Sequence, residues 1–365
     1  MSSIIKLNKV FFLTLFAAFI GLVSYEIDLQ NRGDIYSLYA QVSHNILIGK
    51  DGVFAFEQRV FPSYIIKFIS WIFRDDYNDA NHIFYKILFV LISISFSWLC
   101  YKGLKISWKK SCILTFLFSL TNVGFFCAGY WLYGFDLVAE LFIILMFHIH
   151  YMDISTPLKA VLFFIICAIW QFTLENVIYV PIFVFFYINA SSIISFEVRK
   201  ILSRAVNYVL GSLVIFSFIL TSVFRHYFLS PGFKVIPYHY FLGQMIMAKP
   251  NLDDIIKQFR EIFLFKNSLV GYSWIQGNAL FLIIGILGCL LILNKKFLSD
   301  KNFAVAALFV FQIIISFLFA HLEETNAYIP LTVNFFVLIA LYEKSENESF
   351  RKEELHLPRQ SRQIN

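Results

Sequence analysis

Long apolar runs recur from one end of the chain to the other, and they constrain its fold more than any other feature. The run VFFLTLFAAFIGLVSY at 10–25 carries no charged side chain, and comparable runs follow it. A helix rising 1.5 Å per residue needs about 20 apolar residues to cross the roughly 30 Å hydrocarbon core of a bilayer. Only 15% of the residues are charged, whereas a soluble domain has about 25%. These features predict an all-α, polytopic membrane protein.

The predicted organisation is a single transmembrane domain, residues 1–342, followed by a polar, disordered cytoplasmic tail, residues 343–365. Residues 60–73 form a shorter apolar run that contains Pro62 and Lys67, so we expect an interfacial or re-entrant helix there. About ten spanning helices are expected, at 10–25, 83–101, 111–128, 134–151, 158–172, 175–190, 207–224, 277–294, 303–320 and 326–342.

Basic residues cluster between the apolar runs, and this clustering sets the predicted orientation. The basic segment YKGLKISWKK at 101–110 is expected in the cytoplasm because cytoplasmic loops carry an excess of Lys and Arg. Both termini are then cytoplasmic, and two long outer loops remain, 26–82 and 225–274. Apolar residues at helical spacing predict surface helices in these loops, at 34–48 and 252–265. The net charge of +6 is therefore a topology signal and not a sign of nucleic-acid binding.

The cysteines and the known short motifs indicate no metal centre. The five cysteines lie in or beside apolar runs, and no CxxC pair occurs, so buried, inert thiols are expected. The sequence contains no Gly-rich phosphate loop, no HExxH and no GxSxG.

Acidic residues near membrane depth gather on the predicted outer side. Glu140 follows Asp136 by one helical turn inside an apolar run, where an ionisable group costs a few kcal/mol. Two explanations for Glu140 stay open: it contacts substrate, or it is protonated or paired with a neighbouring helix. Asp34 is either a functional acid or a cap for the surface helix at 34–48, and Arg59 either binds an anion or reaches lipid headgroups. The candidate functional residues on this side are Asp28, Asp34, Arg59, Trp131, Asp136, Glu140, Glu175, Arg225 and Glu324.

The order of these features resembles the GT-C class of membrane glycosyltransferases. The run Asp34, Tyr36, Ala40, Gly49, then QRVFP with Arg59 and Pro62, is similar to a pattern in many uncharacterised bacterial members. YGFDLVAE at 133–140, the acid at Glu175 and HLEETNAYIP at 321–330 also fit the general plan of that class.

The resemblance implies a bacterial inner-membrane enzyme that moves a sugar from a polyprenyl-phosphate donor to a glycan or lipid acceptor on the extracytoplasmic face. The family's catalytic acid corresponds to Asp34 or to Asp28, and either carboxylate would take the acceptor's proton. Arg59 or Arg225 would hold the departing phosphate. Trp131 would meet the sugar, and Asp136, Glu140, Glu175 and Glu324 would complete the substrate site. No cofactor is certain, although a divalent cation is compatible with the chemistry.

Three other classes remain open from the residues. An O-antigen or capsule polymerase fits the basic second outer loop, residues 225–274. A transporter or flippase would place charged residues along a path at mid-membrane, for which Glu140 is the main candidate. A non-catalytic membrane scaffold would tolerate replacement of every acid.

Overall fold

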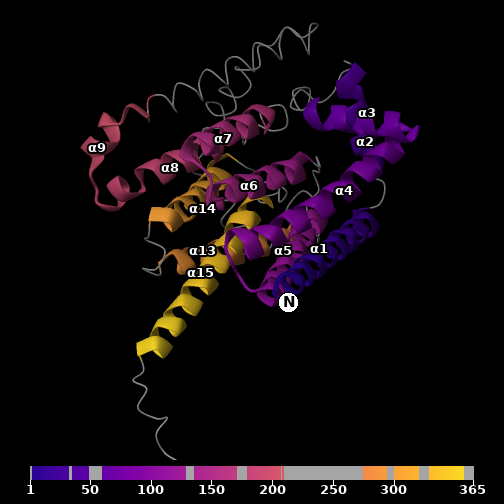
Figure 1. The fold of residues 1–365 in the computed structure, drawn as a ribbon. Helices are drawn as coiled ribbons and strands as arrows, with labels where there is room; N and C mark the ends of the chain where they lie inside the picture. The colour runs from indigo at the N-terminus through magenta and orange to yellow at the C-terminus, as the bar shows by residue number, and fades with distance from the viewer. Residues whose placement is uncertain are drawn as a thin grey trace, which may run out of the picture.

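The structure, a computed structural model, describes residues 2–32, 35–48, 60–128, 135–170, 179–206, 208, 274–293, 300–319 and 329–356, and every regular element in these ranges is a helix (Figure 1). The all-α prediction is thus confirmed for these residues. The elements are α1 (Ser2–Arg32), α2 (Ile35–Ile48), α3 (Val60–Phe73), α4 (Tyr77–Trp98), the π-helical turn η1 (Leu99–Gly103), α5 (Trp108–Ala128), α6 (Phe135–Tyr151), α7 (Thr156–Trp170), α8 (Tyr179–Ile194), α9 (Val198–Ser203), α13 (Trp274–Ile292), α14 (Asp300–Phe319) and α15 (Ile329–His356).

Nine of the ten predicted spanning segments overlap helices, while the segment at 207–224 lies outside the described residues except for residue 208. Both short helices predicted between the first two spanning segments are present, as α2 and α3, and the predicted surface helix at 252–265 lies outside the described residues. Among the described residues, two helical segments are long and apolar enough to cross a membrane, Asn8–Asn31 and Tyr77–Gly103.

Helices α1 and α4 form an antiparallel pair at one side of the bundle (Figure 1). The Trp98 indole donates to the Thr14 hydroxyl over 3.0 Å near the beginning of α1, and Tyr25 and His82 share a hydrogen bond of 2.8 Å near its end. The end of α1 therefore lies beside the beginning of α4. We call this end of the bundle the Asp28 end, after the acid in the last two turns of α1.

Helices α5 and α6 also run antiparallel to the helix that precedes each of them. Ser93 of α4 and Ser119 of α5 share a buried hydrogen bond of 3.2 Å, and the Asn122 amide of α5 donates to Glu140 of α6. Since α5 runs antiparallel to α4, it ends at the Asp28 end, and α6 begins there.

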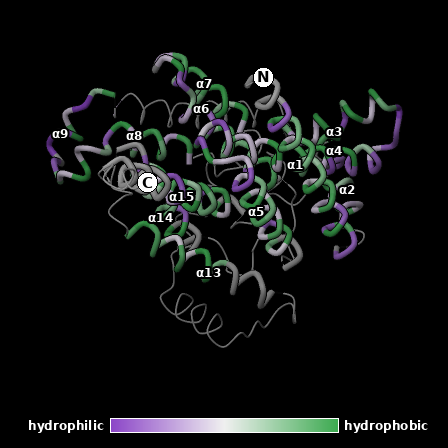
Figure 2. Tube along the Cα trace, turned by 60° about the horizontal axis from the view of Figure 1, so that its bottom comes forward, coloured by the Kyte–Doolittle hydropathy of each residue, from purple (hydrophilic) through white to green (hydrophobic). Residues whose placement is uncertain are grey.

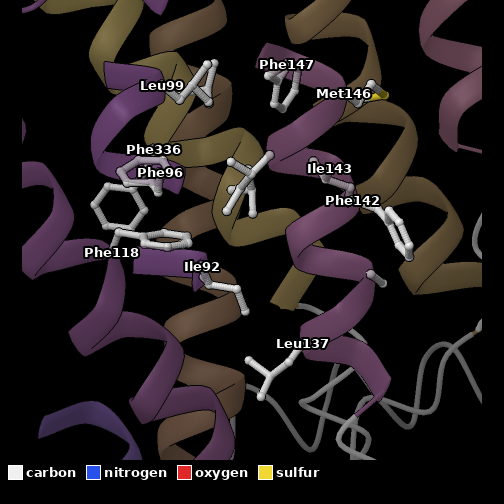
Figure 3. Packing of buried hydrophobic residues seen from close by; sticks show 14 of the residues in the cluster. Ile92, Phe96, Leu99, Phe118, Leu137, Phe142, Ile143, Met146, Phe147 and Phe336 are labelled. Atoms are coloured by element: carbon white, nitrogen blue, oxygen red, sulfur yellow. The ribbon is translucent and has the colours of Figure 1, made fainter. Parts of the chain in front are cut away.

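Helix α15 packs antiparallel to α5 across an aromatic cluster (Figure 3). The Phe96 and Phe118 rings stack with centroids 4.1 Å apart, and Phe336 of α15 meets both rings edge-on. At the opposite end of the bundle, Lys110 of α5 forms an ion pair with Glu343 of α15. Helix α15 therefore begins at the Asp28 end.

Helices α7, α8 and α14 also have ends there. Trp170, the last residue of α7, stacks on Phe142 in the second turn of α6, with centroids 5.6 Å apart. Tyr179, the first residue of α8, contacts Phe311 in the second half of α14. The Asp28 end thus gathers the ends of α1, α5, α7 and α14 and the beginnings of α4, α6, α8 and α15.

The helices approach closely where small residues face a neighbour. A Cβ atom added to Gly21 of α1 would lie 2.7 Å from the backbone oxygen of Phe89 in α4. The side chains of Ser93, Ser97 and Ser119 are buried between helices. Small and weakly polar residues at helix contacts are typical of membrane helix packing, because they let the backbones come together.

Several helices are apolar along much of their length (Figure 2), and many of their apolar side chains are exposed. Phe11 and Phe19 of α1, for example, are 65% and 62% exposed. A soluble monomer rarely exposes a contiguous apolar patch larger than a few hundred Å². Exposed apolar side chains include Phe11, Leu15, Phe19 and Leu22 on α1, Ile113, Phe116 and Leu120 on α5, Val161, Phe164 and Ile165 on α7, and Ile283, Ile286 and Leu290 on α13.

The predicted disorder of the tail is wrong for its first half, because α15 continues without a break to His356 and projects from the bundle (Figure 1). The residues from 343 to 356 are rich in Glu, Lys and Arg, which have high helix propensity. A helix already nucleated in the bundle can extend through such a segment without a new nucleation cost.

Candidate functional site

Three of the predicted site residues lie among the described residues, and all three are buried toward the Asp28 end. Asp28 is at the last two turns of α1, Asp136 is in the first turn of α6, and Glu140 is one turn further along α6. Their exposed fractions are 0%, 8% and 0%. Buried carboxyl groups are costly unless they are neutral, paired or hydrogen-bonded, so the partners of each define what it can do.

Asp28 lies against an aromatic cluster formed by α1, α2 and α4. The Tyr36 hydroxyl of α2 donates a hydrogen bond to Asp28 Oδ2. The Tyr36 ring contacts the rings of Tyr25, His82 and Tyr85, with centroids 5.6, 5.3 and 5.2 Å away. The first turn of α2 is thereby fixed over the end of α1, and the Asp28 carboxyl group is held in one orientation.

A second layer of hydrogen bonds holds this cluster in place. The Asn81 amide donates to the Tyr36 carbonyl oxygen over 2.9 Å, and His82 Nδ1 shares a hydrogen bond with the Tyr25 hydroxyl. Sequence reasoning missed Asn81 and His82 as parts of the site. Their signal is weak, because they follow Asn78 and Asp79 in the polar first turns of α4, ahead of its apolar part.

A cation stands beside the cluster. Lys86 forms an ion pair of 3.2 Å with Glu26, and its ammonium group lies 5.1 Å from the centre of the Tyr25 ring. The Lys86 and Glu26 side chains are 45% and 50% exposed, so this pair is accessible from outside the bundle. It supplies positive charge one turn of α4 away from His82.

Asp136 and Glu140 lie on one face of α6, and their surroundings differ. Asp136 interacts electrostatically with Tyr179 of α8. Glu140 accepts a hydrogen bond from Asn122 of α5. The ring centroids of Phe61 in α3 and Phe142 in α6 are 6.4 Å apart, so the short helix α3 reaches the helix that carries both acids.

The other predicted site residues, Asp34, Arg59, Trp131, Glu175, Arg225 and Glu324, lie outside the described residues. Asp34, Trp131, Glu175 and Glu324 fall in gaps of the sequence whose flanking helix ends all belong to the Asp28 end. Asp28, Asp136 and Glu140 are therefore the residues on which a site can be built from described contacts.

Among the described residues, no group of three or more His, Cys, Asp and Glu side chains is placed to hold a metal ion. The divalent cation remains a prediction from the resemblance. The chemistry that the described residues offer is proton transfer and hydrogen bonding: a carboxyl group oriented by a phenol, with aromatic faces around it.

Comparison with known proteins gives no match, since no protein-family model, no curated protein and no solved structure matches this chain.

Proposed function

We propose that the chain is an integral membrane glycosyltransferase, with Asp28 as its catalytic base. It takes a sugar from a polyprenyl-phosphate donor at the extracytoplasmic face of the bacterial inner membrane and passes it to a glycan or lipid acceptor. The observation that carries the proposal is the Asp28 carboxyl group at the end of α1, oriented by the Tyr36 hydroxyl within an aromatic cluster. The exposed apolar side chains of the bundle support a membrane location. About ten membrane-spanning helices with both termini in the cytoplasm are part of the proposal, and they rest on the apolar runs and the basic segments of the sequence.

The proposed reaction needs little help at the leaving group. A polyprenyl phosphate departs as an anion, so the demanding proton transfer is removal of the acceptor's hydroxyl proton by a base. The acceptor oxygen attacks the anomeric carbon, the bond from that carbon to the phosphate oxygen breaks, and the acceptor's proton moves to Asp28. Arg59 and Arg225 are the proposed cations for the phosphate, because a guanidinium group binds phosphate oxygens in pairs. Asp136, Glu175, Glu324 and Trp131 are the proposed contacts to sugar and acceptor.

Asp28 is preferred to Asp34 in this proposal because its surroundings suit a base. Aromatic rings exclude water from the carboxyl group, and Tyr36 fixes its orientation. Asp28 has no exposed surface, so an acceptor reaches it when the Tyr36–Asp28 hydrogen bond opens. Since Tyr36 is in the first turn of α2, movement of α2 is the proposed gate.

The proposal is tested in membranes from cells that express the wild-type chain or Asp28→Asn at matched levels. Membranes are incubated with a panel of polyprenyl-phosphate sugars, and the polyprenyl phosphate released is measured by mass spectrometry, because this product is common to every sugar. Asp75→Asn is the control, since Asp75 is an exposed acid in the turn between α3 and α4. Surface polysaccharide and glycolipid are profiled in the same cells.

We expect release with the wild-type chain and with Asp75→Asn, and a loss of at least about 100-fold with Asp28→Asn, as for removal of a general base. If Asp28→Asn is as active as the wild type, Asp28 is not the base, and Asp34→Asn becomes the decisive variant. Consumption of a pyrophosphate-linked oligosaccharide instead identifies a polymerase. No change in any glycan or lipid contradicts both enzymatic proposals and favours transport.

A further inference from the structure

Glu140 and Asn122 are joined by one hydrogen bond in the interior of the bundle, and each side chain has a second polar atom that this bond does not use. Asn122 Nδ2 donates to Glu140 Oε1 between α5 and α6, and both side chains are buried. The other two polar atoms of these groups, Glu140 Oε2 and Asn122 Oδ1, are buried with no hydrogen-bond partner among the described residues. Both of these atoms are acceptors when Glu140 is ionised, so no hydrogen bond can join them.

A second buried pair provides the comparison within the same molecule. Asn334 Nδ2 of α15 donates to Gln312 Oε1 of α14 over 2.6 Å. The atoms left over there are Gln312 Nε2 and Asn334 Oδ1, which are a donor and an acceptor. These two amides have a complementary donor and acceptor left over, which the structure does not join. The leftover atoms of Asn122 and Glu140 become complementary only when Glu140 carries a proton.

We infer that Glu140 and Asn122 form a proton-binding site, in which one proton held on Glu140 Oε2 is donated to Asn122 Oδ1. A single proton then satisfies both unpartnered atoms and closes a neutral, two-bond link between α5 and α6. The inference rests on the contacts of this pair and does not depend on the proposed transferase activity.

The alternatives require partners that the described residues do not supply. An ionised Glu140 would be a buried charge with one donor, and no Lys or Arg among the described residues forms an ion pair with it. Asp136, one turn away on the same face of α6, adds negative potential and disfavours a second charge. A bound metal cation would also satisfy the two oxygens, and the experiment below separates it from a proton.

With this proton in place, Glu140 has a structural role. A neutral carboxylic acid that is hydrogen-bonded to Asn122 carries no negative charge with which to act on a substrate. It links α5 to α6. Asp136 is then the carboxyl group of α6 that stays in the proposed substrate site at the Asp28 end.

Infrared spectroscopy of the purified full-length chain in detergent tests the proton directly, because a protonated carboxylic acid has a carbonyl band separate from that of a carboxylate. We expect such a band in the wild type at neutral pH, shifted by ¹³C-glutamate labelling and absent from Glu140→Gln. Asn122→Ala should move the band to higher frequency, because the acid loses its acceptor. Asn334→Leu is the matched control, since it breaks the other buried pair and should leave the band unchanged.

Thermal unfolding of the same variants adds a second readout that does not depend on the band. Glu140→Gln supplies an N–H in place of the acid's O–H, so we expect its Tm to stay near the wild-type value. Glu140→Met removes both hydrogen bonds of Asn122, so its Tm should fall. Absence of the band, or a wild-type Tm that rises with NaCl, LiCl or CaCl₂ and loses that rise in Glu140→Gln, would overturn the inference in favour of an ionised, cation-bound carboxylate.

Discussion

The close approach of α1 and α4 at Gly21 leads to a sharp prediction for Gly21→Ala. The added methyl group would lie 2.7 Å from the Phe89 oxygen, 2.7 Å from the Val90 Cα atom and 2.9 Å from the Val90 nitrogen. All three atoms belong to the backbone of α4, so no side-chain rotation relieves the clash. To reach an ordinary contact of about 3.4 Å, the two helices must separate by about 0.7 Å.

The cost follows from two opposing terms. Alanine in place of glycine favours a helix by about 1 kcal/mol. Forcing an extra methyl group into a packed contact costs typically about 1–3 kcal/mol, and backbone atoms place Gly21 in the upper part of that range. Separation also weakens neighbouring contacts, since a gap of about 0.5–1 Å removes a quarter to a half of the van der Waals attraction of each contact. We therefore expect Gly21→Ala to lower the free energy of unfolding by about 1–2 kcal/mol.

Gly285→Ala is the matched control, because it makes the same chemical change in helix α13. A Cβ atom there would meet Ile313 Cδ1 at 4.0 Å, which is an ordinary contact. The propensity term should then act alone, and the variant should be as stable as the wild type or up to about 1 kcal/mol more stable. The stability of both variants is measured by thermal unfolding of the detergent-solubilised protein, with size-exclusion chromatography as the readout of the folded fraction. A Tm for Gly21→Ala equal to or above that of Gly285→Ala would refute the packing of α1 on α4 described here.

Three further predictions test other contacts. Gln312→Leu leaves the buried Asn334 amide without its acceptor and should cost about 1–3 kcal/mol, whereas the double variant with Asn334→Leu should recover most of that loss in a double-mutant cycle. Cys289 is exposed on the apolar outer face of α13, so a charged maleimide should not label it in native membranes and should label it after denaturation; labelling in intact membranes would place that face in water. Glu343→Ala should cost less than about 1 kcal/mol because its ion pair is partly exposed, and Lys110→Glu combined with Glu343→Lys should be more stable than either single reversal.

The positions of the helices could be predicted from the sequence because each apolar run is long and its flanks are polar. The run at 60–73 was recognisable as a helix different from the others, and α3 begins at Val60 with Pro62 in its first turn, where a missing N–H costs nothing. The pairing of helices could not be predicted, since an apolar face does not identify its neighbour. The contact at Gly21 depends on which residues of α4 lie opposite, and that is a property of the assembled bundle.

The candidate site could also be predicted only in part, because residue types are visible in the sequence and their partners are not. A charge in or at the start of an apolar run is conspicuous, so Asp136 and Glu140 could be selected from the sequence. Asp28 was selected through the resemblance and placed in the loop 26–82, whereas α1 continues to Arg32 and buries it. The partners of these acids could not be predicted, because Tyr36 reaches Asp28 across the break between α1 and α2, and Asn122 is an ordinary amide among many. The motif left Asp34 and Asp28 as alternatives for the catalytic acid, and the phenol that contacts Asp28 became visible only once α2 was placed over α1.

The unbroken course of α15 has a mechanical consequence. Its 28 residues span about 42 Å at 1.5 Å per residue, from the Asp28 end to a polar tip beyond the bundle. A helix is stiff along its axis, so an axial shift at Thr332 would be transmitted almost undiminished to the tip, past the ion pair of Lys110 with Glu343. A spin label attached to the tip would therefore report displacement at the far end of the molecule without disturbing any residue there.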